Sequence, residues 1–243
     1  MNKIKISFLR KKDKASEAYT QSFDYEGDCH ISVVEMIEYI NHHPPEPEGA
    51  DGPFRPISYE SSCEQGLCGA CAMVVNGKPV LACETFCDEA ADRDGRIKVE
   101  PLSKFPVVCD LTVDRSELFE IMKKMGLWVE GQAAVSPSTL QLQYIAAQCL
   151  LCGCCLEVCP NYAAGDFFAG APGAVSAMNM LKLNGGSRHK DEIKKQYGER
   201  VFKTCTKSRA CELVCPAKIP VLTLMSEANR LSVWRLWQFF CGK

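Results

Sequence analysis

Cysteine distribution is the strongest constraint on this chain, which contains sixteen cysteines in 243 residues. All but Cys29, Cys87, Cys109 and Cys241 lie in three groups, which run from Cys63 to Cys83, from Cys149 to Cys159 and from Cys205 to Cys215. The N-terminal segment MNKIKISFLR does not resemble a secretory signal, and the chain contains no apolar run of about 18 residues that would predict a membrane-spanning helix. We therefore expect a reducing compartment, where grouped cysteines act as metal ligands more often than as disulfides.

The first group has the spacing of plant-type [2Fe–2S] proteins, with four, two and eleven residues between successive cysteines: Cys63, Cys68, Cys71 and Cys83. Three thiolates on one short loop require a sharply turning backbone, which Gly66 and Gly69 allow. A zinc site is an alternative, but this spacing is uncommon for zinc. Cys87 competes with Cys83 as the fourth ligand, and we favour Cys83 because it lies where a predicted hairpin returns.

The second group has the bacterial ferredoxin spacing and ends in a Cys-Pro pair: Cys149, Cys152, Cys155 and Cys159-Pro160. In such a run the fourth cysteine serves a different cluster, so the missing ligand must come from elsewhere. The third group ends in Cys215-Pro216, which completes a [4Fe–4S] ligand set of Cys149, Cys152, Cys155 and Cys215. Cys154 is left over, and we expect it to be a packing thiol that points away from the cluster.

Three cysteines remain for a third cluster: Cys159, Cys205 and Cys211. The segment CTKSRAC has Ser208 where a standard run would have its middle cysteine. Three thiolates favour a [3Fe–4S] cluster, which is a cubane that lacks the unligated iron. A weak serine ligand, and hence a second [4Fe–4S] cluster, is the alternative.

The first hundred residues have a mixed pattern of strands and helix. Strands are predicted at Lys3–Leu9, Ala18–Tyr25 and Arg96–Leu102, and Asn76-Gly77 predicts a hairpin between Ala72–Val75 and Pro79–Cys83. A helix is predicted at Ser32–His42 with Ser32 as its N-cap. From Ser116 onwards the pattern is helical, in segments 116–129, 136–147, 174–184, 190–198 and 221–240. The break at Phe105–Asp114 is the expected domain boundary.

Composition excludes few functions but argues against nucleic-acid binding, because the net charge is −2 and the basic clusters are short. We expect Arg10–Lys14 to form a solvated turn between strands. His42 and His43 begin a loop rich in proline and glycine, and we expect them to be exposed rather than metal-bound.

Four segments together resemble one family, the iron–sulfur subunits of succinate:quinone oxidoreductases, which are called succinate dehydrogenase or quinol:fumarate reductase. They are SCEQGLCGACAMVVNGKPVLAC, PLSKFPVVCDLTVD, CLLCGCCLEVCP and CTKSRACELVCPAKIP. The resemblance implies an α+β chain with a β-grasp [2Fe–2S] ferredoxin domain over residues 1–105 and an all-α helical ferredoxin domain over residues 106–243. It also implies the three ligand sets already derived from spacing. The chain departs from the family at Cys109, often a basic residue, at Thr206, often histidine, and after Pro160, where no tryptophan follows.

The resemblance implies an electron-transfer role without catalytic residues of the carbon chemistry on this chain. Its expected partners are a flavoprotein with covalent FAD and a membrane anchor of cytochrome b type, often with haem b. Electrons would pass singly through [2Fe–2S], [4Fe–4S] and [3Fe–4S] to or from menaquinone or ubiquinone. The expected location is the cytoplasmic face of the inner membrane. Both directions of the reaction share these motifs, and we favour fumarate reductase slightly.

The C-terminal segment SVWRLWQFFCGK is apolar and aromatic, with basic residues around it. It predicts either a helix at the membrane interface or on the anchor, or a terminal helix packed on its own domain. Competing functions are a soluble multi-cluster ferredoxin-like carrier, a subunit of a soluble fumarate reductase or heterodisulfide-reductase-like enzyme, and a structural zinc protein.

Overall fold

The computed structural model describes residues 3–44, 54–163, 165, 167–186 and 189–234. Of these residues, those up to Asp114 together with Cys152–Cys154 form one compact unit, and those from Arg115 to Leu151 together with those from Cys155 onwards form a second. The predicted division between residues 105 and 106 stays a prediction, and the packing changes units after Asp114.

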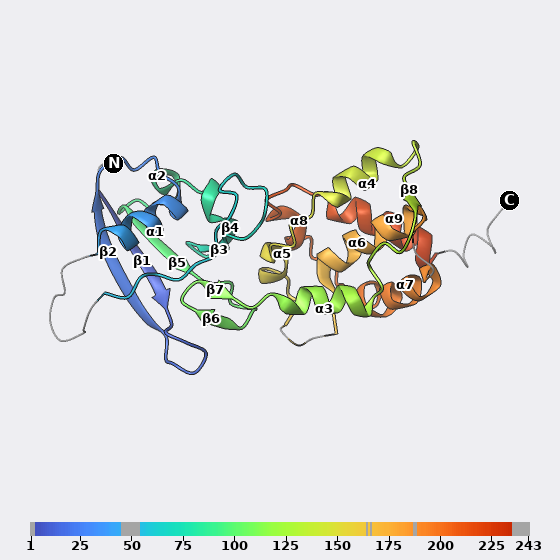
Figure 1. Ribbon diagram of the computed structural model, residues 1–243, viewed down its shortest axis with the longest axis horizontal. Helices are drawn as coiled ribbons and strands as arrows, with labels where there is room; N and C mark the ends of the chain where they lie inside the picture. Colours follow the sequence, from blue (N-terminus) through green and yellow to red (C-terminus); the bar gives the residue numbers. More distant parts are fainter. Residues whose placement is uncertain (1–2, 45–53, 164, 166, 187–188, 235–243) are drawn as a thin grey trace. The chain divides into compact units, whose positions relative to one another are not determined.

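The N-terminal unit is built on a five-stranded sheet in the order β2-β1-β5-β3-β4 (Figure 1). Its strands are β1 (Lys3–Arg10), β2 (Tyr19–Glu26), β3 (Ala72–Val75), β4 (Lys78–Leu81) and β5 (Arg96–Glu100). The pair β1 and β5 is parallel, and the other neighbouring pairs are antiparallel. Alternate residues Ile4, Ile6 and Phe8 of β1 are fully buried, which is the period expected of a strand with one covered face.

Helix α1 (Val33–His42) begins at the predicted N-cap, Ser32. The Ser32 hydroxyl accepts a hydrogen bond from the Glu35 amide, and the Glu35 carboxylate accepts one from the Ser32 amide, so both halves of a capping box are present. The apolar face that the sequence predicts, including Met36 and Ile37, is buried. The hairpin between β3 and β4 also forms as predicted, because Asn76 and Gly77 both adopt positive φ angles of 48° and 76°.

Short elements complete this unit and link the sheet to the predicted cysteine sites. They are η1 (Ala82–Glu84), α2 (Cys87–Ala90) and the two-stranded ribbon of β6 (Val107–Cys109) and β7 (Thr112–Val113). The predicted strand at Pro79–Cys83 therefore ends earlier, at Leu81, and Cys83 lies in a tight helical turn.

The burial of Arg10 contradicts the expectation that residues 10–14 form a solvated turn. Arg10 is the last residue of β1 and is only 1% exposed, whereas its neighbours Lys12 and Lys14 are exposed. Its guanidinium donates to both carboxylate oxygens of Asp110, at 3.3 Å from Nε and 2.9 Å from Nη2. The prediction failed because the charged partner is a hundred residues away in sequence.

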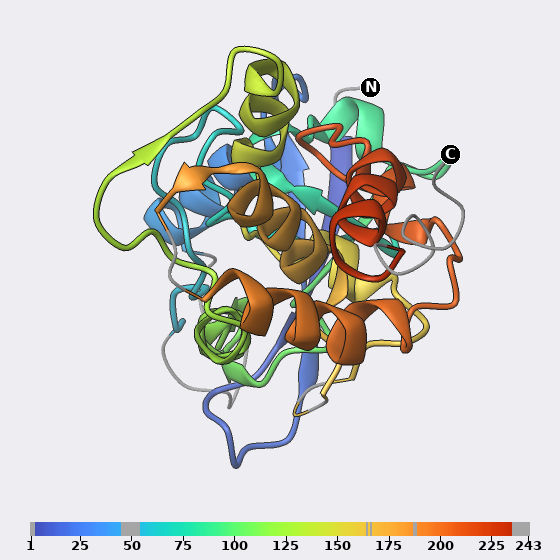
Figure 2. The same cartoon turned by 90° about the vertical axis from the view of Figure 1, so that its right-hand side faces the viewer.

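The C-terminal unit is helical, and α6 (Gly170–Lys182) packs against the other long helices (Figure 2). These are α3 (Ser116–Lys124), α4 (Leu140–Ala147), α7 (Lys190–Tyr197) and α9 (Val221–Ser232). Short elements connect them: β8 (Ala133–Ala134), α5 (Cys154–Glu157), β9 (Asn184–Gly185), η2 (Gly198–Phe202) and α8 (Ala210–Leu213). Tyr197 is fully buried, and its hydroxyl donates to Asn229 Oδ1 at 2.7 Å, which ties α7 to α9.

The predicted helix at residues 221–240 is present as α9, which ends at Ser232. Trp234 is 44% exposed, and the rest of the aromatic segment lies outside the described residues. In the described part of the chain, no helix combines the length and apolar character needed to cross a membrane.

Candidate cluster sites

The loop from Cys63 to Cys71 directs several backbone N–H groups at cysteine sulfurs. Cys63 Sγ accepts from the amides of Gln65 and Leu67 at 3.5 and 3.3 Å. Cys68 Sγ accepts from the Ala70 amide at 3.5 Å. Such donors stabilise negative charge on sulfur, and hydrogen bonds from Gln65, Cys68 and Leu67 lower the pKa of Cys63 to about 7.

The fourth sulfur reaches this loop from η1. Cys83 Sγ lies 3.3 Å from Cys71 Sγ and accepts from the Gly66 amide at 3.3 Å. The hydrogen bond from the Ala82 amide to the Cys71 carbonyl, at 3.1 Å, holds the two segments together. Burial raises the pKa of Cys71 to about 12, so this thiol stays protonated at neutral pH unless a positive charge lies beside it.

Glycine at position 66 is favoured by the backbone conformation of the loop. Its φ is +68°, and a Cβ placed there would lie 2.2–2.5 Å from the carboxyl group of Glu84. The Glu84 carboxyl group is the end of a flexible side chain and could move aside, but any other residue would be strained at this φ. The sharp turn that the sequence predicted at Gly66 is therefore present in the loop.

Cys87 lies apart from this constellation, in α2. It is fully buried, and its amide donates to the Ile31 carbonyl at 2.8 Å. Burial raises the pKa of Cys87 to about 12, and the neighbouring thiol that adds to this shift is Cys29. The geometry supports Cys83 rather than Cys87 beside the loop, while the ligand assignment itself stays a prediction.

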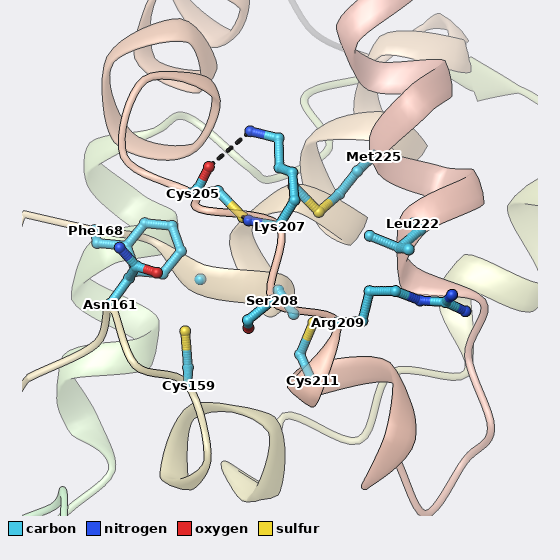
Figure 3. Close-up of a pocket in the computed structure, with 12 residues that line it drawn as sticks. Cys159, Asn161, Phe168, Cys205, Lys207, Ser208, Arg209, Cys211, Leu222 and Met225 are labelled. Carbon is cyan, nitrogen blue, oxygen red and sulfur yellow. Dashed lines mark hydrogen bonds between the residues drawn. The ribbon is translucent and has the colours of Figure 1, made fainter.

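Three cysteines of the helical unit line one pocket: Cys159, Cys205 and Cys211. Ser208 lines the same pocket, and Figure 3 shows its side chain between those of Cys159 and Cys211. Burial and the charges of Cys159 and Cys205 raise the pKa of Cys211 to about 11. The structure thus gathers the three thiols that the sequence assigned to one cluster, with the serine among them.

The pocket has apolar walls and polar loop contacts. Phe168, Leu222 and Met225 line it. The Thr206 hydroxyl donates to Asn161 Oδ1 at 2.6 Å, and Asn161 Nδ2 donates to the Thr204 carbonyl at 3.0 Å. These bonds tie the segment after Cys159 to the segment around Cys205. Sequence analysis flagged Thr206 and the absence of tryptophan near Asn161 only as departures, and no local signal predicted this contact.

The predicted [4Fe–4S] ligands divide between the two packing units. Cys149, Cys155 and Cys215 pack at the edge of the core of the helical unit. Cys215 Sγ accepts from the Ile219 amide at 3.5 Å. Cys152 groups with the N-terminal unit, as does the fully buried Cys154. The four-cysteine set and the packing role of Cys154 stay predictions.

No three His, Cys, Asp or Glu side chains among the described residues are close enough to hold a single metal ion. A cluster does not need such convergence, because each of its iron atoms is bound by at most two protein thiolates, and bridging sulfides supply its other ligands. The thiols, the N–H donors at the first loop and the shared pocket of the third group fit iron–sulfur clusters.

His43 stacks on Tyr39, and its Nδ1 lies 3.0 Å from the Tyr39 carbonyl.

Two family models match the chain, a 2Fe-2S iron-sulfur cluster binding domain at residues 3–120 and a 4Fe-4S dicluster domain at residues 145–219. The succinate dehydrogenase iron-sulfur subunit of Bacillus subtilis is 28% identical, over 98% of this chain and 96% of the relative. The fumarate reductase iron-sulfur subunit of Haemophilus influenzae is 29% identical, over 88% and 86%. The chain belongs to the family of succinate dehydrogenase and fumarate reductase iron–sulfur subunits. As a member of this family it has the predicted order of a [2Fe–2S] ferredoxin domain and a helical cluster domain.

The fold agrees with this assignment. A chain of the Mycobacterium smegmatis Sdh1 complex superposes with a TM-score of 0.79 at 19% identity, covering 96% of this chain and 97% of that one. The predicted α+β class, with a ferredoxin domain before a helical domain, is confirmed. Cofactor classes [2Fe–2S] and [4Fe–4S] are likewise confirmed, and the [3Fe–4S] cluster stays a prediction.

Proposed function

We propose that this chain is the electron-transfer subunit of a membrane-bound succinate dehydrogenase or fumarate reductase complex. It would pass single electrons between the FAD of a flavoprotein subunit and a quinone at a membrane-anchor subunit. The observation that carries the proposal is the gathering of Cys159, Cys205 and Cys211 around one pocket. A single-cluster ferredoxin has no need of such a site, and the Bacillus subtilis succinate dehydrogenase iron-sulfur subunit aligns with 98% of the chain.

Each cluster would have its own set of thiolates on this chain. Cys63, Cys68, Cys71 and Cys83 would hold [2Fe–2S], Cys149, Cys152, Cys155 and Cys215 would hold [4Fe–4S], and Cys159, Cys205 and Cys211 would hold [3Fe–4S]. When bound, iron–sulfur clusters accept and release single electrons at potentials set by their surroundings. The chain's contribution is to fix the sulfurs, to aim N–H groups at them and to exclude water.

The carbon chemistry would take place on the flavoprotein, and this chain would supply no catalytic residue to it. The anchor would be of cytochrome b type, with haem b, and menaquinone or ubiquinone would bind beside it. These partners imply a peripheral position at the cytoplasmic face of the cell membrane. Two exposed leucines are consistent with covered surfaces in a complex, because Leu67 on the first cysteine loop is 69% exposed and Leu213, between Cys211 and Cys215, is 79% exposed.

The physiological direction of the reaction is not decided by the relatives, because some are named succinate dehydrogenase and others fumarate reductase. The slight preference for fumarate reductase stays a prediction. The midpoint potential of the third cluster would distinguish the two directions of the reaction. A low value suits menaquinol oxidation and fumarate reduction, and a high value suits succinate oxidation with ubiquinone.

The test is purification of the complex through an affinity tag on this chain from detergent-treated native membranes. We expect a flavoprotein that contains FAD to co-purify. We also expect succinate to donate electrons to the clusters, which low-temperature electron paramagnetic resonance (EPR) would detect as a change in their signals. A brown protein that purifies alone from the soluble fraction and does not respond to succinate or fumarate would support the ferredoxin-like carrier instead.

A further inference from the structure

Lys207 holds a positive charge beside the backbone of Cys205, one of the third group of cysteines, on the side away from Cys159 and Cys211 (Figure 3). Its Nζ donates to the Cys205 carbonyl at 2.8 Å and to the Phe202 carbonyl at 3.3 Å, the first of which is drawn in Figure 3. The ammonium also lies 5.4 Å from the centre of the Phe202 ring. Although the residue is exposed, these contacts fix its charged end next to the backbone of a predicted ligand.

The hydrogen bonds of the Lys207 ammonium go to neutral carbonyl groups. Two cations, Lys207 and Arg209, line the pocket. Among the described residues, no carboxylate side chain lines it. The carbonyl groups that Lys207 binds lie at and just beyond the end of η2, where helix carbonyls present partial negative charge. The ammonium therefore adds a positive charge where these carbonyl groups otherwise present a partial negative charge.

We propose that Lys207 raises the midpoint potential of the third cluster, and the inference rests on the proposed function. Reduction adds one electron, and so one negative charge, to the ligated cluster without making or breaking a bond. A nearby positive charge stabilises the reduced form more than the oxidised form. Lys207 is thus a positioning residue for electron transfer, because it acts through the field at the cluster.

Arg209 provides a matched control on the same loop. Like Lys207 it has a positive φ, 65° against 62°, and it lines the same pocket. Its Nη2 lies 3.4 Å from Glu212 Oε1, so its charge is partly compensated. Figure 3 shows its side chain directed away from the three cysteines.

The experiment is an EPR redox titration of the third cluster in the membrane-bound complex, with Lys207→Gln, Lys207→Met, Lys207→Arg and Arg209→Gln. For both neutral Lys207 variants we expect reduction to become roughly tenfold less favourable, which is about 59 mV for a one-electron couple. Lys207→Arg should retain the original potential, and Arg209→Gln should shift it by less than half as much. The backbone hydrogen bond from the residue 207 amide to Cys205 Sγ, at 3.4 Å, is available in every variant.

The outcomes separate this inference from the proposed function. A normal [3Fe–4S] signal with equal midpoints in all variants would overturn the role of Lys207 and leave the proposed function intact. Equal shifts in Lys207→Gln and Lys207→Arg, or loss of the cluster in both neutral variants, would assign Lys207 to loop structure instead. Absence of any [3Fe–4S] signal in the unaltered complex would overturn both the inference and the third cluster.

Discussion

Replacement of Asp110 by alanine should destabilise the N-terminal unit more than any other single change at a charged residue there. Asp110 is fully buried and adopts a positive φ of 46° in the ribbon between β6 and β7. Its carboxylate accepts from Arg10, from Arg55 Nη2 at 2.5 Å, and from the amides of Lys11 and Ser58 at 3.0 Å each. The network therefore joins the end of β1, the ribbon and the segment that leads to Cys63.

The magnitude follows from the charge that alanine would leave behind. Arg10 is 1% exposed, and removing one partner of a buried ion pair costs about 3–5 kcal/mol. Arg55 is partly exposed and adds little, because water can replace its partner. For a unit of about a hundred residues each kcal/mol lowers Tm by about 4 °C, so we expect a decrease of roughly 12–20 °C.

The assay is heat-induced loss of the visible circular dichroism of the [2Fe–2S] cluster in the purified complex. Asp13→Ala is the control, because Asp13 is an exposed aspartate that accepts hydrogen bonds from the Ala15 and Ser16 amides within a turn. The control should lower the transition by only a few degrees. If Asp110→Ala and Asp13→Ala behave alike, the buried ion pair does not hold this unit together.

Acid should weaken the same network. Burial opposes the charge of Asp110, but hydrogen bonds from Arg10, Ser58 and Arg55 outweigh burial and place the pKa of Asp110 below its ordinary value. A lowered folded-state pKa gives stability that is present above the unfolded-state pKa, about 3.9, and is lost as the pH falls through the folded-state value. The difference in Tm between wild type and Asp110→Ala should therefore be constant near neutral pH and shrink only below about pH 4.

Three further predictions concern the cysteine sites. Cys83→Ala should abolish the [2Fe–2S] EPR signal, whereas Cys87→Ser should keep it and lower stability by about 1–3 kcal/mol because it buries a hydroxyl group; loss of the signal in both variants would contradict this. Ser208→Cys should convert the third cluster to [4Fe–4S], seen as disappearance of the oxidised [3Fe–4S] signal, and an unchanged signal would show that residue 208 does not face the missing iron. Gly66→Ala should reduce [2Fe–2S] content, measured as iron per complex, since alanine is strained at the φ of +68° that the loop adopts there; full iron content would refute the need for glycine at this turn.

Local patterns predicted much of the fold. The alternation in β1, the Ser32 cap and the Asn76-Gly77 hairpin all form where the sequence places them, because each depends on neighbouring residues. Element ends were less predictable. Cys83 lies in η1 rather than in a strand, because the chain turns there to bring its sulfur to the loop.

The sequence by itself determined the [2Fe–2S] and [4Fe–4S] cluster classes, since ligand spacing reflects how far a short loop can reach around iron and sulfur. It also determined the order of the two domain types and the family. Only the tertiary structure showed that Cys83 approaches Cys71 while Cys87 is buried elsewhere. Burial of Arg10 against Asp110 and the contact between Thr206 and Asn161 also emerged only in three dimensions. Each joins residues far apart in the chain, and their partners are selected by packing and charge rather than by spacing.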